Sequence, residues 1–119
     1  MYFSIRSIKQ ANKEAGQHFF DAGTMRFFHS RVCRKVIGNY FVTSEQFDAT
    51  TPRRYTLRRV DERGHVDTIG DFQAFATSRA AYQEAARLWA AECLEIQMDE
   101  RADAGRWEAY TAPSLSPGA

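Results

Sequence analysis

The chain has 119 residues, of which 44% are hydrophobic and 26% are charged, and these proportions are those of one ordinary soluble globular domain. The 16 Lys and Arg residues and 15 Asp and Glu residues leave a net charge of +1, which excludes a uniformly basic, histone-like protein and a uniformly acidic DNA mimic. No stretch approaches the roughly 18 apolar residues of a membrane span, and residues 1–6 lack the layout of a secretory signal, so we expect a cytoplasmic protein without membrane contact.

The even charge balance conceals an asymmetry along the chain. Residues 1–65 hold 12 Lys and Arg against 6 Asp and Glu, a net charge of +6. Residues 66–119 hold 4 against 9, a net charge of −5. The first half is therefore basic and the second half acidic, which leaves room for a local basic surface.

The first predicted element is a short helix over residues 4–15. Its apolar residues recur at helical spacing and share one face, namely Ile5, Ile8, Ala11 and Ala15. Ser4 and Ser7 are alternative N-caps, and Gly16 is suited to end the helix. A turn over residues 21–23 follows, and it separates the pair Phe19–Phe20 from the pair Phe27–Phe28. We expect at least one ring of each pair to lie in the core.

The next segments predict four antiparallel strands, over residues 31–37, 40–44, 55–60 and 65–75. Gly38 and Asn39 allow the positive φ angles of a tight hairpin turn between the first two. Pro52 marks a strand boundary because it cannot donate to a ladder. Residues 61–64 form a turn, and the last strand is bent near Gly70.

A second, longer helix is predicted over residues 79–98, capped by Thr77 or Ser78. Its apolar stripe consists of Tyr82, Ala85, Trp89, Cys93 and Ile96. Residues 101–110 either extend this helix or form another turn of it, and a disordered tail is expected over residues 111–119.

These elements predict a single α+β domain over residues 1–110. Its order is α-β-β-β-β-α, and the simplest packing is a two-layer arrangement with a four-stranded antiparallel sheet. In that packing the short N-terminal helix and the long C-terminal helix lie on one face. The other face of the sheet is partly exposed to solvent.

The residues offer little support for catalysis. Three histidines and two cysteines lack the spacing of a zinc site, so we expect no metal, and no motif predicts a cofactor. Cys33 lies among basic residues, which lower a thiol pKa, and His29 is a candidate base for it. Cys33 is equally suited to a core position, and Cys93 lies on the apolar stripe of the long helix.

The basic residues are the most informative candidates for a binding surface. Arginine beside exposed tyrosine suits contact with phosphates and stacking on bases. The alternative is that these side chains are solvated or pair with acidic residues of the second half, such as Glu84, Glu92, Glu95 and Asp99. The candidate set is Arg26, Arg31, Arg34, Lys35, Tyr40, Arg53, Arg54, Tyr55, Arg58, Arg59 and Arg63.

Several motifs between Ile8 and Ala86 resemble those of small bacteriophage and prophage proteins of unknown function. They are Phe19-Phe20 followed by Thr24-Met25-Arg26-Phe27-Phe28 and Ser30-Arg31, then Tyr40 to Phe47, then Arg53 to Arg58. The resemblance implies a small accessory protein acting in the cytoplasm of a bacterial host. Phage proteins of this size often bind and block a host defence complex, anti-CRISPR proteins among them.

The leading hypothesis is therefore a binding protein, not an enzyme, that engages a host protein or ribonucleoprotein through an arginine-rich edge. Direct binding of nucleic acid is the second hypothesis. The element order is similar to that of double-stranded-RNA-binding domains, but the helix start at residues 78–81 lacks their lysine cluster. A small cysteine-dependent enzyme is the third. The oligomeric state is left open.

Overall fold

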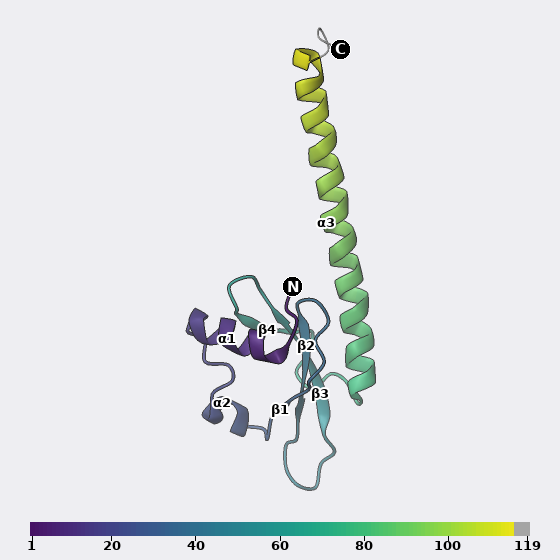
Figure 1. The fold of residues 1–119 in the computed structure, drawn as a ribbon. Helices are drawn as coiled ribbons and strands as arrows, with labels where there is room; N and C mark the ends of the chain where they lie inside the picture. Colours follow the sequence, from purple (N-terminus) through teal and green to yellow (C-terminus); the bar gives the residue numbers. More distant parts are fainter. Residues whose placement is uncertain (116–119) are drawn as a thin grey trace. The chain divides into compact units, whose positions relative to one another are not determined.

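The structure of the protein is a computed structural model that describes the backbone of residues 1–115 and the side chains of residues 1–102 (Figure 1). Its elements are α1 (Ile5–Ala15), α2 (Ala22–Arg26), β1 (Arg31–Val32), β2 (Tyr40–Glu45), β3 (Arg54–Val60), β4 (Val66–Ile69) and α3 (Ser78–Leu115). The chain divides into two compact units, Met1–Trp89 and Ala90–Ala119. The expected domain of residues 1–110 spans the first unit and most of the second.

The sheet has four strands in the order β1-β2-β3-β4, and each neighbouring pair is antiparallel. In the register, Val42 of β2 lies opposite Leu57 of β3, which lies opposite Ile69 of β4. A short N-terminal helix, four antiparallel strands and a long C-terminal helix thus follow in the predicted order. The predicted α+β class is confirmed.

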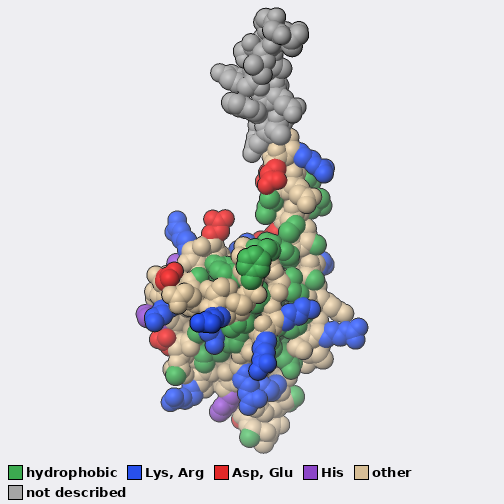
Figure 2. All heavy atoms as spheres, in the orientation of Figure 1, with side chains coloured by type: hydrophobic (Ala, Val, Ile, Leu, Met, Phe, Trp, Pro, Cys, Tyr) green, Lys and Arg blue, Asp and Glu red, His purple; other side chains and the backbone are tan. Residues whose placement is uncertain are grey.

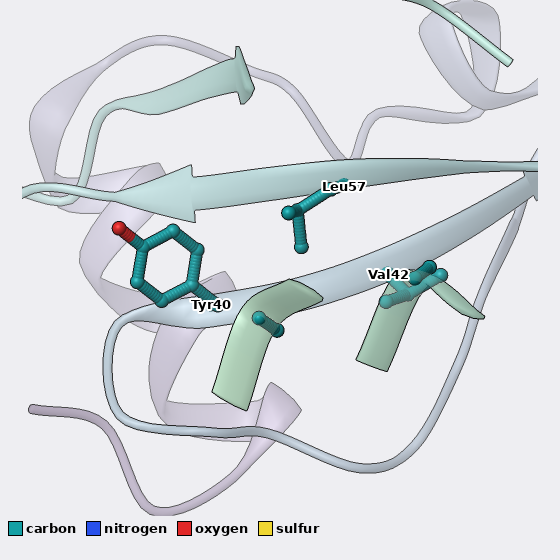
Figure 3. Close-up of a cluster of buried hydrophobic side chains, with 5 residues drawn as sticks. Tyr40, Val42 and Leu57 are labelled. Carbon is teal, nitrogen blue, oxygen red and sulfur yellow. The ribbon is translucent and has the colours of Figure 1, made fainter. Parts of the chain in front are cut away.

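The two faces of the sheet carry separate cores. Tyr40, Val42 and Leu57 pack on one face with Ala81 and Ala85 of α3 (Figure 3). On the other face, the buried partners are Ile8 of α1, Phe41, Val60 and Val66. Because neighbouring strand residues point to opposite faces, α1 and the start of α3 cover opposite sides of the sheet.

The expectation that both helices share one face is therefore wrong. Every residue of β2 is buried, as it must be in a strand covered on both sides. The consecutive apolar residues Tyr40, Phe41 and Val42 carry that signal, since a half-solvated strand alternates apolar and polar side chains.

Local signals place the helix ends and the tight turn as expected. Ser4 and Ser7 form a capping box at the start of α1, and Gly16 ends it in the left-handed region with φ 77°. Thr77 caps α3, because its hydroxyl accepts the Ala80 N–H at 3.1 Å. Ile37 and Tyr40 exchange two backbone hydrogen bonds around Gly38, whose φ is 60°. Only the first central residue of that turn uses a positive φ.

Some bounds differ from those expected. β1 comprises only Arg31–Val32, and an additional short helix, α2, occupies the expected turn after Asp21. α3 continues past the expected end near residue 98 and includes residues 111–115 of the expected tail, while residues 116–119 lie outside the described residues. Among the described residues, no helix combines the length and apolarity needed to cross a membrane.

Candidate docking groove

Two arginines of the predicted binding set are held by the chain's own backbone. Arg53 donates from Nε to the Ser44 hydroxyl and from Nη2 to the Ser44 carbonyl, both at 3.1 Å, and Nη2 also contacts the His29 carbonyl. Arg54 donates to the carbonyls of Gln73 and Ala74, at 2.8 and 3.2 Å. Both side chains therefore tie loops to the sheet, a role that the sequence pattern did not indicate.

Four further residues of the set are buried or half-buried in the fold. Tyr40 is only 4% exposed, so the expectation of an exposed ring is wrong. Tyr55 is half-buried against the α3 core. Arg58 is buried, whereas Arg59 is half-buried with its guanidinium 5.8 Å from the centre of the Tyr40 ring.

The remaining members of the set are exposed: Arg26, Arg31, Arg34, Lys35 and Arg63. They come from the end of α2, the segment around β1 and the turn after β3. Figure 2 shows Lys and Arg side chains scattered over the visible face, with hydrophobic side chains between them. The five exposed cations of the predicted arginine-rich edge therefore come from three separate segments of the chain.

A cluster of aromatic rings, which we call the phenylalanine patch, lies on the surface instead. It comprises Phe27, Phe28, Phe47 and Phe72. The Phe28 ring centre lies 4.4, 6.0 and 5.2 Å from those of Phe27, Phe47 and Phe72, respectively. Phe27, Phe47 and Phe72 are 77%, 68% and 42% exposed.

The patch joins three loops that are far apart in the sequence. Phe27 and Phe28 follow α2, Phe47 follows β2, and Phe72 precedes α3. The Phe28 carbonyl accepts the Gln46 N–H at 2.9 Å, which fixes the first loop against the second. Sequence reasoning placed one ring of the Phe27–Phe28 pair in the core and overlooked Phe47 and Phe72. Their only local signal is a large apolar residue next to aspartate in a turn-forming segment.

A groove of about 450 Å³ opens at the patch. Its apolar lining is formed by Phe19, Met25, Phe27, Phe28 and Phe72, and its polar lining includes Arg58. A volume of this size accommodates a large side chain of a partner or a small molecule.

Arg58, at the floor of the groove, belongs to a polar network on the α1 face of the sheet. Nε of Arg58 donates to the Thr43 hydroxyl at 3.0 Å, and Nη1 donates to the Thr68 hydroxyl. Nη2 lies 3.6 Å from Oε2 of the fully buried Glu45, whose Oε1 accepts the Thr56 hydroxyl. Burial lowers the pKa of the Arg58 guanidinium, and the attraction of Glu45 opposes that shift.

Two phenylalanines flank the same guanidinium. The Arg58 Cζ lies 5.2 Å from the ring centre of Phe19 and 5.7 Å from that of Phe72. These are distances of cation–π contacts. Arg58 is thus held in one orientation by hydroxyls, a carboxylate and two rings.

Asn12 positions the Phe19 wall of the groove. This α1 residue is 1% exposed, and its Oδ1 accepts the Phe19 N–H at 2.9 Å. Its Nδ2 donates to the Gly64 carbonyl at 2.9 Å and to Oε1 of Gln17 at 2.6 Å. One side chain therefore connects α1, the segment before α2 and the turn between β3 and β4.

The candidate nucleophile Cys33 lies in the core position that the sequence left open as its alternative. Cys33 is half-buried in the core beneath α3, and burial raises the pKa of its thiol. A raised pKa reduces the thiolate population on which nucleophilic attack depends. Among the described side chains, no group of three His, Cys, Asp or Glu residues is arranged to hold a metal ion.

Comparison with known protein families finds a match to most of the chain. Residues 4–86 match a family described as "Family of unknown function (DUF7447)". The matched range includes the groove, its polar floor and the first turns of α3. No curated protein and no solved structure matches the chain significantly.

Proposed function

The chain belongs to the DUF7447 family, and we propose that it is a non-catalytic binding protein that docks a host protein on the phenylalanine patch. The exposure of Phe27 and Phe72 at one groove, with the exposed Phe47 stacked on Phe28 beside it, carries this proposal. Aromatic residues grouped around a pocket are typical of the energetic centre of protein interfaces, and a contiguous apolar surface on a small domain marks an interaction site.

A protein partner fits the site better than a nucleic acid does. Arg53 and Arg54 use part of their donor capacity on backbone carbonyls of this chain, and the charge of Arg58 is balanced by Glu45, so the three side chains do not form one phosphate-binding surface. The exposed cations Arg31, Arg34 and Lys35 remain for steering an acidic partner surface toward the site.

The kind of partner protein is proposed from the sequence resemblance to small phage proteins. It supports a bacterial partner, and a complex of host defence is the class we propose first. In this proposal the protein acts by occupying a surface of that complex, without any chemical step.

The test is affinity capture from a bacterial lysate with three forms of the full chain. Phe27→Ser/Phe47→Ser removes two exposed rings of the patch, and Phe3→Ser removes a ring that is 85% exposed but lies outside it. We expect the wild type and Phe3→Ser to retain the same partner and the double variant to lose it. Retention by all three forms, or by none, contradicts the proposal.

A nucleic-acid partner is the alternative outcome. It would appear as a mobility shift at low salt that weakens steeply as salt rises, because released counterions drive such binding. The shift would be lost in Arg31→Glu/Arg34→Glu, which reverses two exposed charges. It would persist in the double phenylalanine variant.

A further inference from the structure

The floor of the groove has hydrogen-bonding capacity that the chain itself does not use. A guanidinium carries five N–H groups. The contacts of Arg58 engage Nε with Thr43, Nη1 with Thr68 and Nη2 with Glu45. The Nη2 contact is an ion pair at 3.6 Å, and Oε2 of Glu45 has no hydrogen-bond partner. Each Nη atom therefore keeps one further N–H.

Arg58 is both buried and accessible from the groove. Its side chain is 11% exposed, and it forms part of the groove lining. Its orientation is fixed by Thr43, Thr68 and the rings of Phe19 and Phe72. A donor held in this way loses little conformational entropy when it binds an acceptor.

The charge of this donor is already balanced. Glu45 is fully buried and lies next to Arg58, so the pair brings no net charge to the floor. A carboxylate entering the groove would place a second buried anion beside one cation, and the desolvation of that anion is costly. A neutral carbonyl accepts the same hydrogen bond without this cost.

We infer that the groove binds an aromatic or large aliphatic side chain of the partner together with an adjacent neutral carbonyl that accepts from Arg58, an inference that rests on the proposed docking function. The apolar walls take the side chain. Arg58 takes the carbonyl and thereby selects a backbone amide over a free carboxylate. The recognised chemistry is that of an internal apolar residue in a peptide, not of a chain terminus or an acidic side chain.

The test uses two small probes on the full chain. N-acetyl-tryptophanamide and N-acetyl-tryptophan differ only in an amide against a carboxylate. Each is titrated at neutral pH while the backbone amide signals of the isotope-labelled protein are followed by NMR. We expect the amide to bind about tenfold more tightly, with signals of Phe28 and Phe72 among those shifted. Equal or weaker binding of the amide, or binding of neither probe, overturns the inference.

Two variants locate the origin of the preference. Arg58→Lys keeps the positive charge beside Glu45 but loses the planar fork, so the preference for the amide should fall to about one. Thr68→Val provides a second reading if the lysine variant does not fold, because Thr68 is exposed on β4 and orients Nη1. A tenfold preference that persists in a folded variant of either kind contradicts the role of Arg58.

The walls are tested separately. Phe27→Ala should weaken both probes by the same factor, whereas Phe3→Ala should weaken neither. Failure of the inference and failure of the proposed function are distinguishable. If the amide probe binds preferentially but no host protein is captured, only the proposed host partner is contradicted. If a host protein is captured but the probes bind equally, only the inference about the neutral carbonyl is contradicted.

Discussion

Nη2 of Arg58 lies 3.6 Å from Oε2 of Glu45, and this ion pair is buried beneath the phenylalanine patch. Three threonine hydroxyls complete its surroundings, from Thr43, Thr56 and Thr68. A polar network of this kind stabilises a fold only as a set, since a buried charge without its partner retains the full cost of desolvation.

The pair should be sensitive to the loss of one member. Arg58→Met leaves the Glu45 carboxylate buried without a counter-charge, and we expect a loss of about 3–5 kcal/mol in the free energy of unfolding. The measurement is a urea unfolding curve at neutral pH. The matched control is Glu45→Met/Arg58→Met, which removes both charges and should recover much of that loss. A double variant as unstable as Arg58→Met would contradict the ion-pair account.

Asn12 should matter as much to stability as a large core residue. Asn12→Ala leaves the Phe19 N–H and the Gly64 carbonyl without this partner, and we expect a loss of about 3 kcal/mol. The exposed neighbour Lys13→Ala, on the same helix, should change stability by less than about 0.5 kcal/mol. Thermal unfolding of both variants checks the contrast, and equal midpoints would refute it.

Gly38 lies against the ring of Trp89. A Cβ at Gly38 would overlap atoms of the Trp89 ring, and the φ of 60° already disfavours an L side chain. Gly38→Ala should therefore cost about 3 kcal/mol of unfolding free energy in urea. Gly23→Ala is the control, because it lies in α2 with open space around its Cβ. Its stability should equal or slightly exceed that of the wild type, and similar losses at both glycines would contradict the steric explanation.

The elements that could be predicted from the sequence are those specified by local chemistry. The Ser4 cap of α1 and the Gly38 turn act over a few residues, so local patterns indicate both, although the capping box pairs Ser4 with Ser7 and the sequence pattern offers the two serines as alternative caps. The face on which α1 packs depends on contacts across the whole domain. Ile8 meets Phe41, Val60 and Val66, and no local pattern specifies that grouping.

The candidate site was predictable only in small part for the same reason. Arginine is most often a solvent-exposed residue type. Arg53 nevertheless donates to the backbone carbonyls of residues 29 and 44, and Arg54 donates to those of residues 73 and 74. Phe28, Phe47 and Phe72 meet only after three loops are brought together by the sheet. Motif spacing contains no information on such long-range contacts.

Stability should decline in acid through Asp61. Its Oδ1 accepts the N–H groups of Arg63 and His65, both at 2.9 Å, and the His65 bond is the largest cause that lowers the pKa of Asp61 below its ordinary 3.8. A lowered folded-state pKa gives stability that is present above 3.8 and is lost as pH falls through the folded value.

The check compares urea unfolding at about pH 6 and about pH 3. Asp61→Asn should show a smaller drop between the two than the wild type does. Glu62→Gln, which removes an exposed carboxylate of the same turn, should behave more like the wild type. If the asparagine variant kept the full acid dependence, Asp61 would not be its source.

Cys33 distinguishes a binding protein from a cysteine-dependent enzyme. Because burial raises the pKa of its thiol, we expect iodoacetamide to modify Cys33 in the folded protein more slowly than it modifies free glutathione at neutral pH. Mass spectrometry of the digested protein follows Cys33 and Cys93 separately, and unfolding in urea should bring both to the rate of a free thiol. Faster modification of Cys33 in the folded state than of glutathione would restore the enzyme hypothesis. Slow modification would show that Cys33 is not an activated thiol, which contradicts a role for His29 as its base, since the thiolate and not the thiol is the attacking species.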